Sequence, residues 1–370
     1  MDKQAQEKLV RAVQRSLVDR YGSGLGADSA QLASLVREHA GVISDLSLLE
    51  VLRALRNDST GVGILEPLVC LPEVTDVLVN GPRQVWVDRG KGLVKSDICF
   101  SNEADIRRLA TRLVVNSGGR LDDSHPYADA RLPRLDGTTL RIHAVIPPLA
   151  HGGTCLSLRV LRPSSLDLQA LIARGAVAPA AASHLRKMLE KRAAFLIVGG
   201  TGSGKTTLLA ALLQSLPATE RLVCIEDTPE LSTSIHPHLV PLAARGANVE
   251  GRGEISLTML LRQALRMRPD RIIVGEIRGG EIVDLLSALN TGHEGGAGTL
   301  HANNLEEVPA RLEALCALGG LGRKEAHSQI LAAVKNIVVM QRTPAGQREL
   351  THIGRLFDSG GLAVETIWEK

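Results

Sequence analysis

Aromatic residues are scarce in this chain of 370 residues, where tryptophan, tyrosine and phenylalanine together make up 2%. Proteins that bind single-stranded nucleic acid commonly stack bases on aromatic side chains, so the composition disfavours that class. The net charge of +3 and the pI of about 8.6 are too weakly basic to indicate nucleic-acid binding alone. The remaining composition, 44% hydrophobic and 22% charged, is typical of a globular protein.

The sequence also has no clustered cysteines and no long apolar run. The five cysteines lie far apart without a CxxC pair, which disfavours a zinc site and indicates reduced thiols in apolar surroundings. No run reaches 18 apolar residues, so we expect no membrane span. The first twenty residues carry charges throughout, which disfavours a secretory signal. These features predict a cytosolic protein, with attachment to a membrane partner left open.

Hydrophobic periodicity divides the chain into four predicted parts. Residues 1–60 carry leucine and valine at helical spacing, which predicts a helical region for packing or for interaction. Residues 61–163 alternate in strand fashion around one amphipathic helix, which predicts a small α+β domain. Residues 164–191 are expected to form a helical linker. From residue 192 to 370, strands alternate with helices, which predicts an α/β domain whose mostly parallel sheet is covered on both faces.

The strongest local signal is GGTGSGKTT, residues 199–207, between the apolar run FLIV and a helical pattern. It fits the phosphate-loop pattern G-x-x-x-x-G-K-[ST]. Glycines let successive backbone N–H groups point at phosphate oxygens, and the helix that follows adds its positive end. We expect Lys205 to reach the β- and γ-phosphates and the Thr206 hydroxyl to bind Mg²⁺. The predicted nucleotide-binding residues are Gly199, Gly200, Thr201, Gly202, Ser203, Gly204, Lys205, Thr206 and Thr207.

Two further apolar strands end in acidic residues. Glu276 follows the apolar run of RIIVGEIRGGE (271–281), and Glu226 and Asp227 follow that of RLVCIEDTPEL (221–231). Because ligands bind outside the carboxyl ends of parallel strands, we expect these acids beside the phosphate loop. A buried charge is costly unless it is paired or used, so we interpret Glu276 and Glu226 as functional. Asp227 precedes Thr-Pro, which leaves a functional role and a turn cap both open.

A glycine-rich segment, TGHEGGAGTLHANN (291–304), carries His293 and His301. Glycines allow close backbone approach. No third metal ligand accompanies the histidines, which disfavours a zinc site. A structural role and a role beside the γ-phosphate, at the end of another core strand, remain as interpretations.

In order and spacing, the segments GGTGSGKTT, CIEDTPEL, RIIVGEIRGGE and TGHEGGAGTLHAN resemble the type II/type IV secretion ATPase superfamily. LRQALRMRPDRIIVGEIRGGE is similar to its tight-adherence (Flp) pilus branch and to conjugation-type ATPases. EPLVCLPEVTDVLVNGP resembles the N-terminal domain of that family, so the resemblance runs from about residue 62 to 340. It implies a RecA-like phosphate-loop NTPase domain, preceded by an α+β domain, in a homohexamer that binds ATP and Mg²⁺. It also implies a location at the inner face of the cytoplasmic membrane, through an inner-membrane platform protein.

The resemblance assigns roles to matching positions. Glu276 would orient or deprotonate the attacking water, Glu226 would support the Mg²⁺–water network, and His301 would lie by the γ-phosphate. Family members also supply arginines from the N-terminal domain, and the candidates within DARLPRLDGTTLRIHAVIPP are Arg131 and Arg141. The segment LPRLDG is longer than the expected LPDG, which disfavours Arg134.

The sequence therefore predicts an ATP-driven motor for pilus assembly or for type II/IV secretion, without direct contact to nucleic acid. A RecA-like nucleic-acid motor, such as a helicase, a recombinase or a conjugative DNA-transfer ATPase, is the alternative because it shares the fold. A nucleotide-dependent switch with negligible turnover would not need Glu276. No NKxD segment follows the phosphate loop, which disfavours a GTPase.

Overall fold

The chain forms two compact units, residues 1–162 and 163–370, in the computed structural model. The structure describes residues 9–10, 12–13, 16, 29–41, 43–45, 47–48, 51–52, 55, 61–90, 92–162, 166–231, 233–246, 252–343 and 345–370. Most of the predicted helical region 1–60 lies outside these residues. Within it, helix α2 (Ser29–Ala40) buries Leu35 and Val36 in a small apolar cluster.

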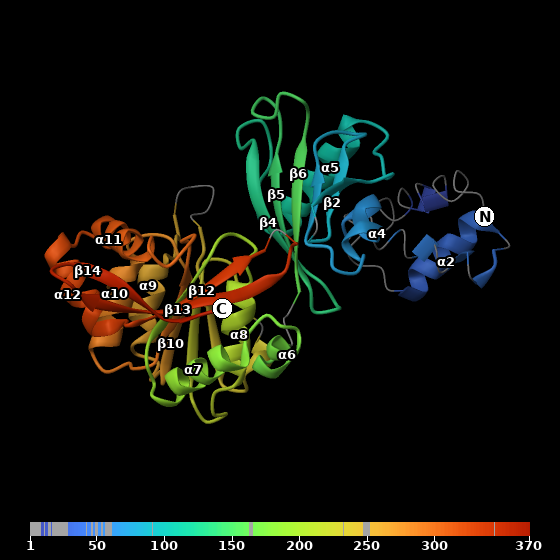
Figure 1. Ribbon diagram of the computed structural model, residues 1–370. Helices are drawn as coiled ribbons and strands as arrows, with labels where there is room; N and C mark the ends of the chain where they lie inside the picture. Colours follow the sequence, from blue (N-terminus) through green and yellow to red (C-terminus); the bar gives the residue numbers. More distant parts are fainter. Residues whose placement is uncertain are drawn as a thin grey trace. The chain divides into compact units, whose positions relative to one another are not determined.

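The first unit contains a six-stranded antiparallel sheet in the order β3-β2-β1-β6-β5-β4 (Figure 1). Its strands are β1 (Asp76–Val79), β2 (Val85–Asp88), β3 (Leu93–Lys95), β4 (Tyr127–Pro133), β5 (Thr139–Val145) and β6 (Cys155–Leu161). Alternate residues face the core, as in β5, where Leu140, Ile142 and Ala144 are buried. The short segments η1 (Gly63–Leu65) and α4 (Glu66–Val69) precede the sheet.

Helix α5 (Glu103–Asn116) covers the apolar face of this sheet. Ile106, Ala110 and Leu113 recur at helical spacing and are buried with the sheet residues. The side chain of Asn102 caps the helix by accepting a hydrogen bond from the Asp105 N–H at 3.0 Å. The opposite face of the sheet therefore holds the polar positions of the strands.

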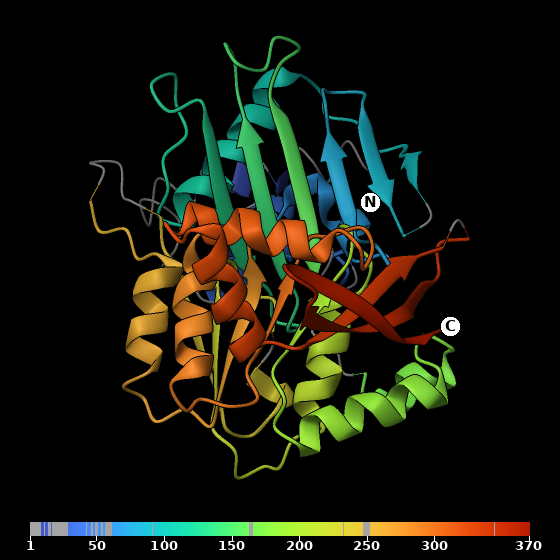
Figure 2. The ribbon, with the colours of Figure 1, turned by 60° about the vertical axis from the view of Figure 1, so that its left-hand side comes forward.

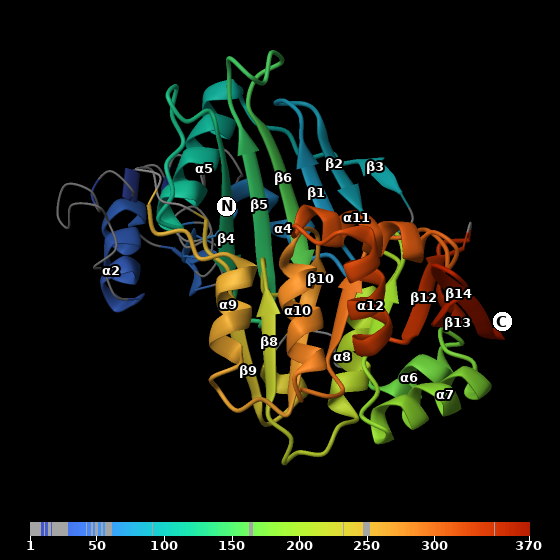
Figure 3. The same ribbon diagram turned by 90° about the vertical axis from the view of Figure 1, so that its left-hand side faces the viewer.

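The second unit contains an eight-stranded sheet in the order β14-β13-β12-β7-β11-β10-β8-β9 (Figures 1 and 3). The strands from β12 to β9 in this order are parallel, whereas β13 and β14 pair antiparallel at one edge. The strands are β7 (Phe195–Val198), β8 (Leu222–Glu226), β9 (Leu239–Ala243), β10 (Arg271–Ile277), β11 (Ala297–Leu300), β12 (Asn336–Arg342), β13 (Arg348–Asp358) and β14 (Leu362–Glu369). The predicted mostly parallel α/β sheet is confirmed.

Helices cover both faces of this sheet (Figures 2 and 3). One face packs against α6 (Leu168–Ala173), α7 (Pro179–Glu190), α8 (Lys205–Gln214) and the short segment η2 (Thr233–Ile235). The other packs against α9 (Leu257–Ala264), α10 (Glu281–Asn290), α11 (Val308–Leu318) and α12 (Arg323–Ala333). Strand β7 is buried throughout and feeds both cores, because Phe195 points to one face and Leu196 to the other. Helices α6 and α7, predicted as a linker, thus share the core of the second unit.

Several elements of the structure were not predicted: β3, β4, β9, α12, β13 and β14. All five of these strands lie at or next to a sheet edge, since β3, β4, β9 and β14 are edge strands and β13 is the neighbour of β14. Among the residues that the structure describes, no helix is long and apolar enough to cross a membrane.

Candidate active site

The loop between β7 and α8 has the backbone that a phosphate loop needs. Gly204, the residue before α8, adopts a left-handed conformation with φ of 97°, which glycine tolerates without strain. A Cβ atom on Gly199 would lie 2.2 Å from the carbonyl oxygen of Met340 on β12. These two positions require glycine, so the spacing of the motif follows from the shape of the loop.

Lys205 lies at the first position of α8 and is buried. Its Nζ donates hydrogen bonds to the carbonyl oxygens of Gly199 at 2.8 Å and Gly200 at 3.0 Å. Burial lowers the pKa of Lys205, while the charges of Glu276 and Glu230 act in the opposite direction. The lysine is therefore within electrostatic reach of two carboxylates from other segments.

Glu230 is a site residue that the sequence reasoning did not single out. Its Oε2 accepts a hydrogen bond from the Thr206 hydroxyl at 3.1 Å. Thr206 is the predicted Mg²⁺ ligand, so this contact places a carboxylate beside that position. The signal was present in CIEDTPEL, but Glu230 lies four residues beyond the end of β8 rather than directly at it.

Glu226 ends β8 and is almost fully buried. Its Oε1 accepts hydrogen bonds from the backbone N–H of Glu230 at 3.0 Å and of Leu231 at 3.2 Å. Gly275 lies beside Glu226 on the neighbouring strand β10, and a Cβ atom on Gly275 would lie 2.6 Å from the Glu226 Cγ. Glu226 thus holds the turn that carries Glu230, and its predicted support of a Mg²⁺–water network stays a prediction.

Glu276 lies at a β-bulge, where the pairing register between β10 and β11 shifts. Val274 pairs with Gly298 and Ile277 with Leu300, so β10 has one extra residue in this interval. Such bulges often re-aim a side chain next to an active site. The carboxylate of Glu276 is thereby presented at the carboxyl edge of the sheet, where the phosphate loop also begins.

Both oxygens of the Glu276 carboxylate have partners. Oε1 lies 2.6 Å from the Nε2 of His301, which comes directly after β11. Oε2 accepts a hydrogen bond from the Nε of Arg278 at 2.7 Å and a second one from its Nη2. The structure therefore brings Glu276 and His301 together, as expected for a site at the strand ends. His293 lies elsewhere, with Nδ1 3.3 Å from the Ala288 carbonyl oxygen.

Arg278 also reaches the end of a neighbouring strand. Its Nη1 lies 3.6 Å from the Oδ2 of Asp227, which follows β8. Arg278 was not predicted as a site residue, although it stands two residues after Glu276 in RIIVGEIRGGE. Its place became visible only from the order of the strands.

The predicted arginines Arg131 and Arg141 lie in the first unit, opposite each other on β4 and β5. Arg141 is in turn paired in register with Arg159 on β6, so three arginines form a row across the polar face of that sheet. Arg159 also donates to Asp76 at 3.0 Å. Arg134 points elsewhere, because its guanidinium binds Glu66, whose interaction raises the pKa of Arg134.

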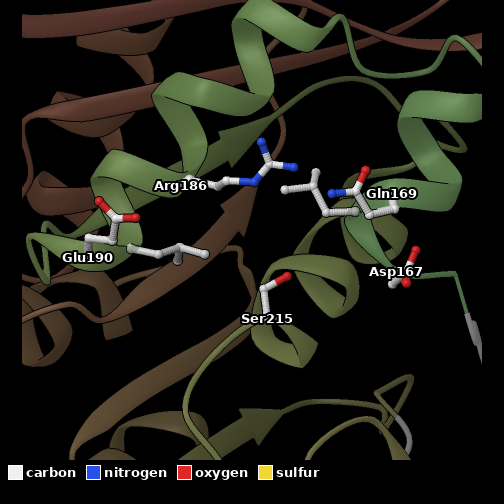
Figure 4. A pocket seen from close by; sticks show the side chains of 7 residues that line it. Asp167, Gln169, Arg186, Glu190 and Ser215 are labelled. Atoms are coloured by element: carbon white, nitrogen blue, oxygen red, sulfur yellow. The ribbon is translucent and has the colours of Figure 1, made fainter.

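A cavity of about 280 Å³ in the second unit is not the phosphate site (Figure 4). It is lined by Asp167, Leu168, Gln169, Arg186, Leu189, Glu190 and Ser215. Arg186 and Gln169 point toward each other across it. Ser215 follows the last turn of α8, whereas the phosphate loop precedes the first turn. The cavity and the phosphate loop therefore lie at opposite ends of this helix.

Fold and motif together define a RecA-like phosphate-loop ATPase domain that follows a smaller N-terminal domain in the sequence. The chain belongs to the type II/IV secretion system protein family, whose family model matches residues 58–348. A Mycobacterium tuberculosis relative named "Putative conjugal transfer protein" is 55% identical over 330 residues, 88% of this chain and 94% of the relative. The type IV secretion system protein PtlH of Bordetella pertussis is 32% identical over 327 residues, 80% of this chain and 94% of the relative.

Solved structures show the same fold at low sequence identity. The Legionella pneumophila ATPase DotB matches with a TM-score of 0.56 and 20% identity over 80% of each chain. The pilus retraction motor PilT, solved with ADP, matches with a TM-score of 0.55 and 19% identity. That match covers 82% of this chain and 81% of PilT. The predicted RecA-like fold with an N-terminal domain is confirmed.

Proposed function

We propose that this chain is a Mg²⁺-dependent ATPase that powers type II/IV secretion, conjugation-type transfer or tight-adherence pilus assembly. The observation that carries the proposal is the position of Glu276. A carboxylate lies at the carboxyl edge of the sheet, held on both oxygens, within electrostatic reach of the phosphate-loop Lys205. A site that only binds nucleotide has no need for a carboxylate placed in this way.

The residues of the phosphate loop fit a nucleoside triphosphate with Mg²⁺. The hydroxyl of Ser203 is buried and, among the described residues, has no hydrogen-bond partner, so it can donate a hydrogen bond to a phosphate oxygen. Cβ atoms built on Gly200 and Gly202 would meet no atom within 4 Å in the described structure. Residues 199–207 would hold the phosphates, Thr206 would bind Mg²⁺, and the bound triphosphate would supply the phosphoryl group that is transferred.

The chemical roles follow from position. Glu276 orients or deprotonates the attacking water, because its carboxylate lies at the carboxyl edge of the sheet within electrostatic reach of Lys205. His301, bonded to Glu276, lies by the γ-phosphate. Glu226 and Glu230 would support the water network around a bound Mg²⁺, since Glu230 contacts Thr206 and Glu226 holds the turn that carries Glu230.

The row of arginines in the first unit supports a role for Arg131 and Arg141 toward the nucleotide. Like charges directly opposite each other on antiparallel strands are destabilising. Arg159 is paired with Asp76, and a bound polyphosphate would offset the repulsion between Arg131 and Arg141.

We further propose a homohexamer that acts at the inner face of the cytoplasmic membrane on a platform protein of the secretion or pilus machinery. The names of the relatives support the link to secretion or transfer machinery, because they include a type IV secretion system protein and a conjugal transfer protein. The hexamer and the membrane partner rest on the family resemblance. A direct nucleic-acid motor is the second candidate, which the conjugal-transfer names favour. ATP hydrolysis that rises on addition of DNA, rather than of the membrane partner, would select it.

The deciding experiment measures nucleotide binding and hydrolysis by the full chain. We expect Mg²⁺-dependent release of phosphate from ATP, and loss of nucleotide binding in Lys205→Ala, because the lysine carries the positive charge of the loop. Lys187→Ala, which changes an exposed cation of α7, is the control. Near-normal affinity for ATP in Lys205→Ala would exclude this site.

A further inference from the structure

Four side chains form a continuous chain of contacts across the ends of three neighbouring strands. His301 after β11 lies 2.6 Å from Glu276 on β10, Glu276 bonds to Arg278, and Arg278 lies 3.6 Å from Asp227 after β8. The strands are adjacent in the sheet in the same order, β11-β10-β8. We call these four residues the strand-end chain. It links Glu276, the carboxylate proposed to act on water, to Asp227, the residue after β8.

The backbone of Arg278 is held independently of its side chain. Glu281, the first residue of α10, accepts hydrogen bonds through Oε1 from the N–H of Arg278 at 2.6 Å and of Gly279 at 2.9 Å. An exposed ion pair usually contributes little because both side chains must be ordered to form it. The backbone of Arg278 is already fixed and its guanidinium contacts carboxylates from two strands, so ordering its side chain costs less conformational entropy.

We propose that Arg278 is a positioning residue for Glu276 and that Asp227 in turn positions Arg278. This inference rests on the proposed hydrolysis of ATP and deepens it. Glu276 is 23% exposed and Arg278 52% exposed, so within the described part of the chain the two hydrogen bonds from Arg278 are what hold Oε2 of the carboxylate in place. A carboxylate that must orient one water molecule loses much of its catalytic effect when its oxygens move by a small distance.

The planar guanidinium explains why this position holds arginine. Its nitrogens spread in a fixed fork, which lets Nε and Nη2 contact Glu276 while Nη1 faces Asp227. An ammonium group is a point charge that can pair with Glu276 but cannot bridge both carboxylates in the same plane. Arg278→Lys should therefore keep the charge and lose the bridge.

The test compares Arg278→Gln, Arg278→Lys, Asp227→Asn and the double variant Arg278→Gln/Asp227→Asn in the full chain. Steady-state kcat and KM for ATP are measured together with the affinity for a fluorescent ATP analogue. Arg262→Gln and Asp284→Asn are matched controls, because they break an Arg–Asp pair at 3.1 Å between α9 and α10 in the same unit. Thermal unfolding midpoints show whether each variant is folded.

We expect kcat to fall roughly tenfold to hundredfold in Arg278→Gln, with analogue affinity changed by less than about threefold. Arg278→Lys should recover part of that loss. Asp227→Asn should lower kcat by about fivefold, the scale of an ion pair near the surface, and should have no further effect on Arg278→Gln. The two control variants should keep the parent kcat.

Three results would overturn the inference. A kcat of Arg278→Gln within twofold of the parent would show that the ion pair is only a surface contact. A loss of analogue affinity that matches the loss of kcat would make Arg278 a binding residue. Equal effects of Asp227→Asn with and without Arg278 would show that the two residues act independently of each other.

Glu276→Gln distinguishes these failures from failure of the proposed function. If the parent hydrolyses ATP and Glu276→Gln does not, the function stands whichever way Arg278 behaves. A parent without ATP hydrolysis removes both.

Discussion

The side chain of Glu226 occupies the space that a Cβ atom on Gly275 would need. The built Cβ atom would lie 2.6 Å from Cγ of Glu226, closer than real contacts allow, and 3.0 Å from its Oε1. Phosphate-loop proteins often place an aspartate before or at the end of the corresponding strand to help hold Mg²⁺. In this chain the position is a glycine, and the neighbouring strand supplies a buried glutamate that fills the same volume.

Gly275→Ala should therefore destabilise the second unit. The methyl group forces Glu226 or its turn to move, and overpacking of this kind costs about 1–3 kcal/mol. Denaturant-induced unfolding measures the loss. Gly246→Ala is the control, because a Cβ atom there would meet no described atom within 4 Å, and it should change stability by less than about 0.5 kcal/mol.

Removal of the Glu226 side chain should relieve the clash. In the Gly275→Ala/Glu226→Ala double variant, the combined loss should be smaller than the sum of the two single losses, since both changes act on one volume. Additive losses would show that the close approach in the structure is not what constrains residue 275.

Glu276→Gln should separate binding from hydrolysis. Glutamine has nearly the same shape and can still contact Arg278 and His301, but it cannot accept a proton from water. We expect normal affinity for an ATP analogue and a kcat lower by roughly a hundredfold or more, the usual contribution of a general base. Glu365→Gln, an exposed acid on β14, is the control. Hydrolysis at the parent rate in Glu276→Gln would mean that another group activates the water.

Local motifs explain what could be predicted of the site. Residues 199–207 form one continuous loop, and its glycines follow from backbone geometry that the sequence encodes directly. Glu276 and His301 could be placed because each ends or follows a short apolar run whose strand character is plain. The contacts of Arg278 and Glu230 could not be predicted, because they depend on which strands are neighbours and on the bulge in β10.

The elements that were missed share a physical reason. Strand β9, LVPLA, contains a proline and lies at a sheet edge, and only its first residue is buried. Strand β13, RELTHIGRLFD, has no regular alternation, because its pairing with β12 leaves one extra residue, Thr351, between Leu350 and His352. Such strands are stabilised by pairing with their neighbours more than by their own pattern. Central strands such as β7, buried on both faces, can be predicted from their composition.

Arg131→Ala tests the proposed contribution of the first unit to hydrolysis. Nucleotide affinity should persist, because residues 199–207 provide it, whereas kcat in the assembled ring should fall at least roughly tenfold. Phosphate release measured across protein concentrations separates ring-dependent from subunit activity. Arg120→Ala, an arginine of the same unit bonded to Asp122, should leave kcat unchanged. An unchanged kcat in Arg131→Ala would remove that residue from the catalytic machinery.

Glu220→Gln should reveal how the second unit fixes the far end of β10. Arg271 begins this strand and is 2% exposed, with Nε bonded to Glu220 at 2.6 Å and Nη2 to the Leu189 carbonyl oxygen at 3.0 Å. Removing the charge of Glu220 leaves a buried guanidinium without its counter-ion, which costs roughly 3 kcal/mol. For a unit of this size, the unfolding midpoint should fall by about 6–12 °C in calorimetry. Arg355 and Glu365 form an exposed pair, so Glu365→Gln should shift the midpoint by only about 1 °C. Equal midpoints for the two variants would mean that solvent already screens Arg271.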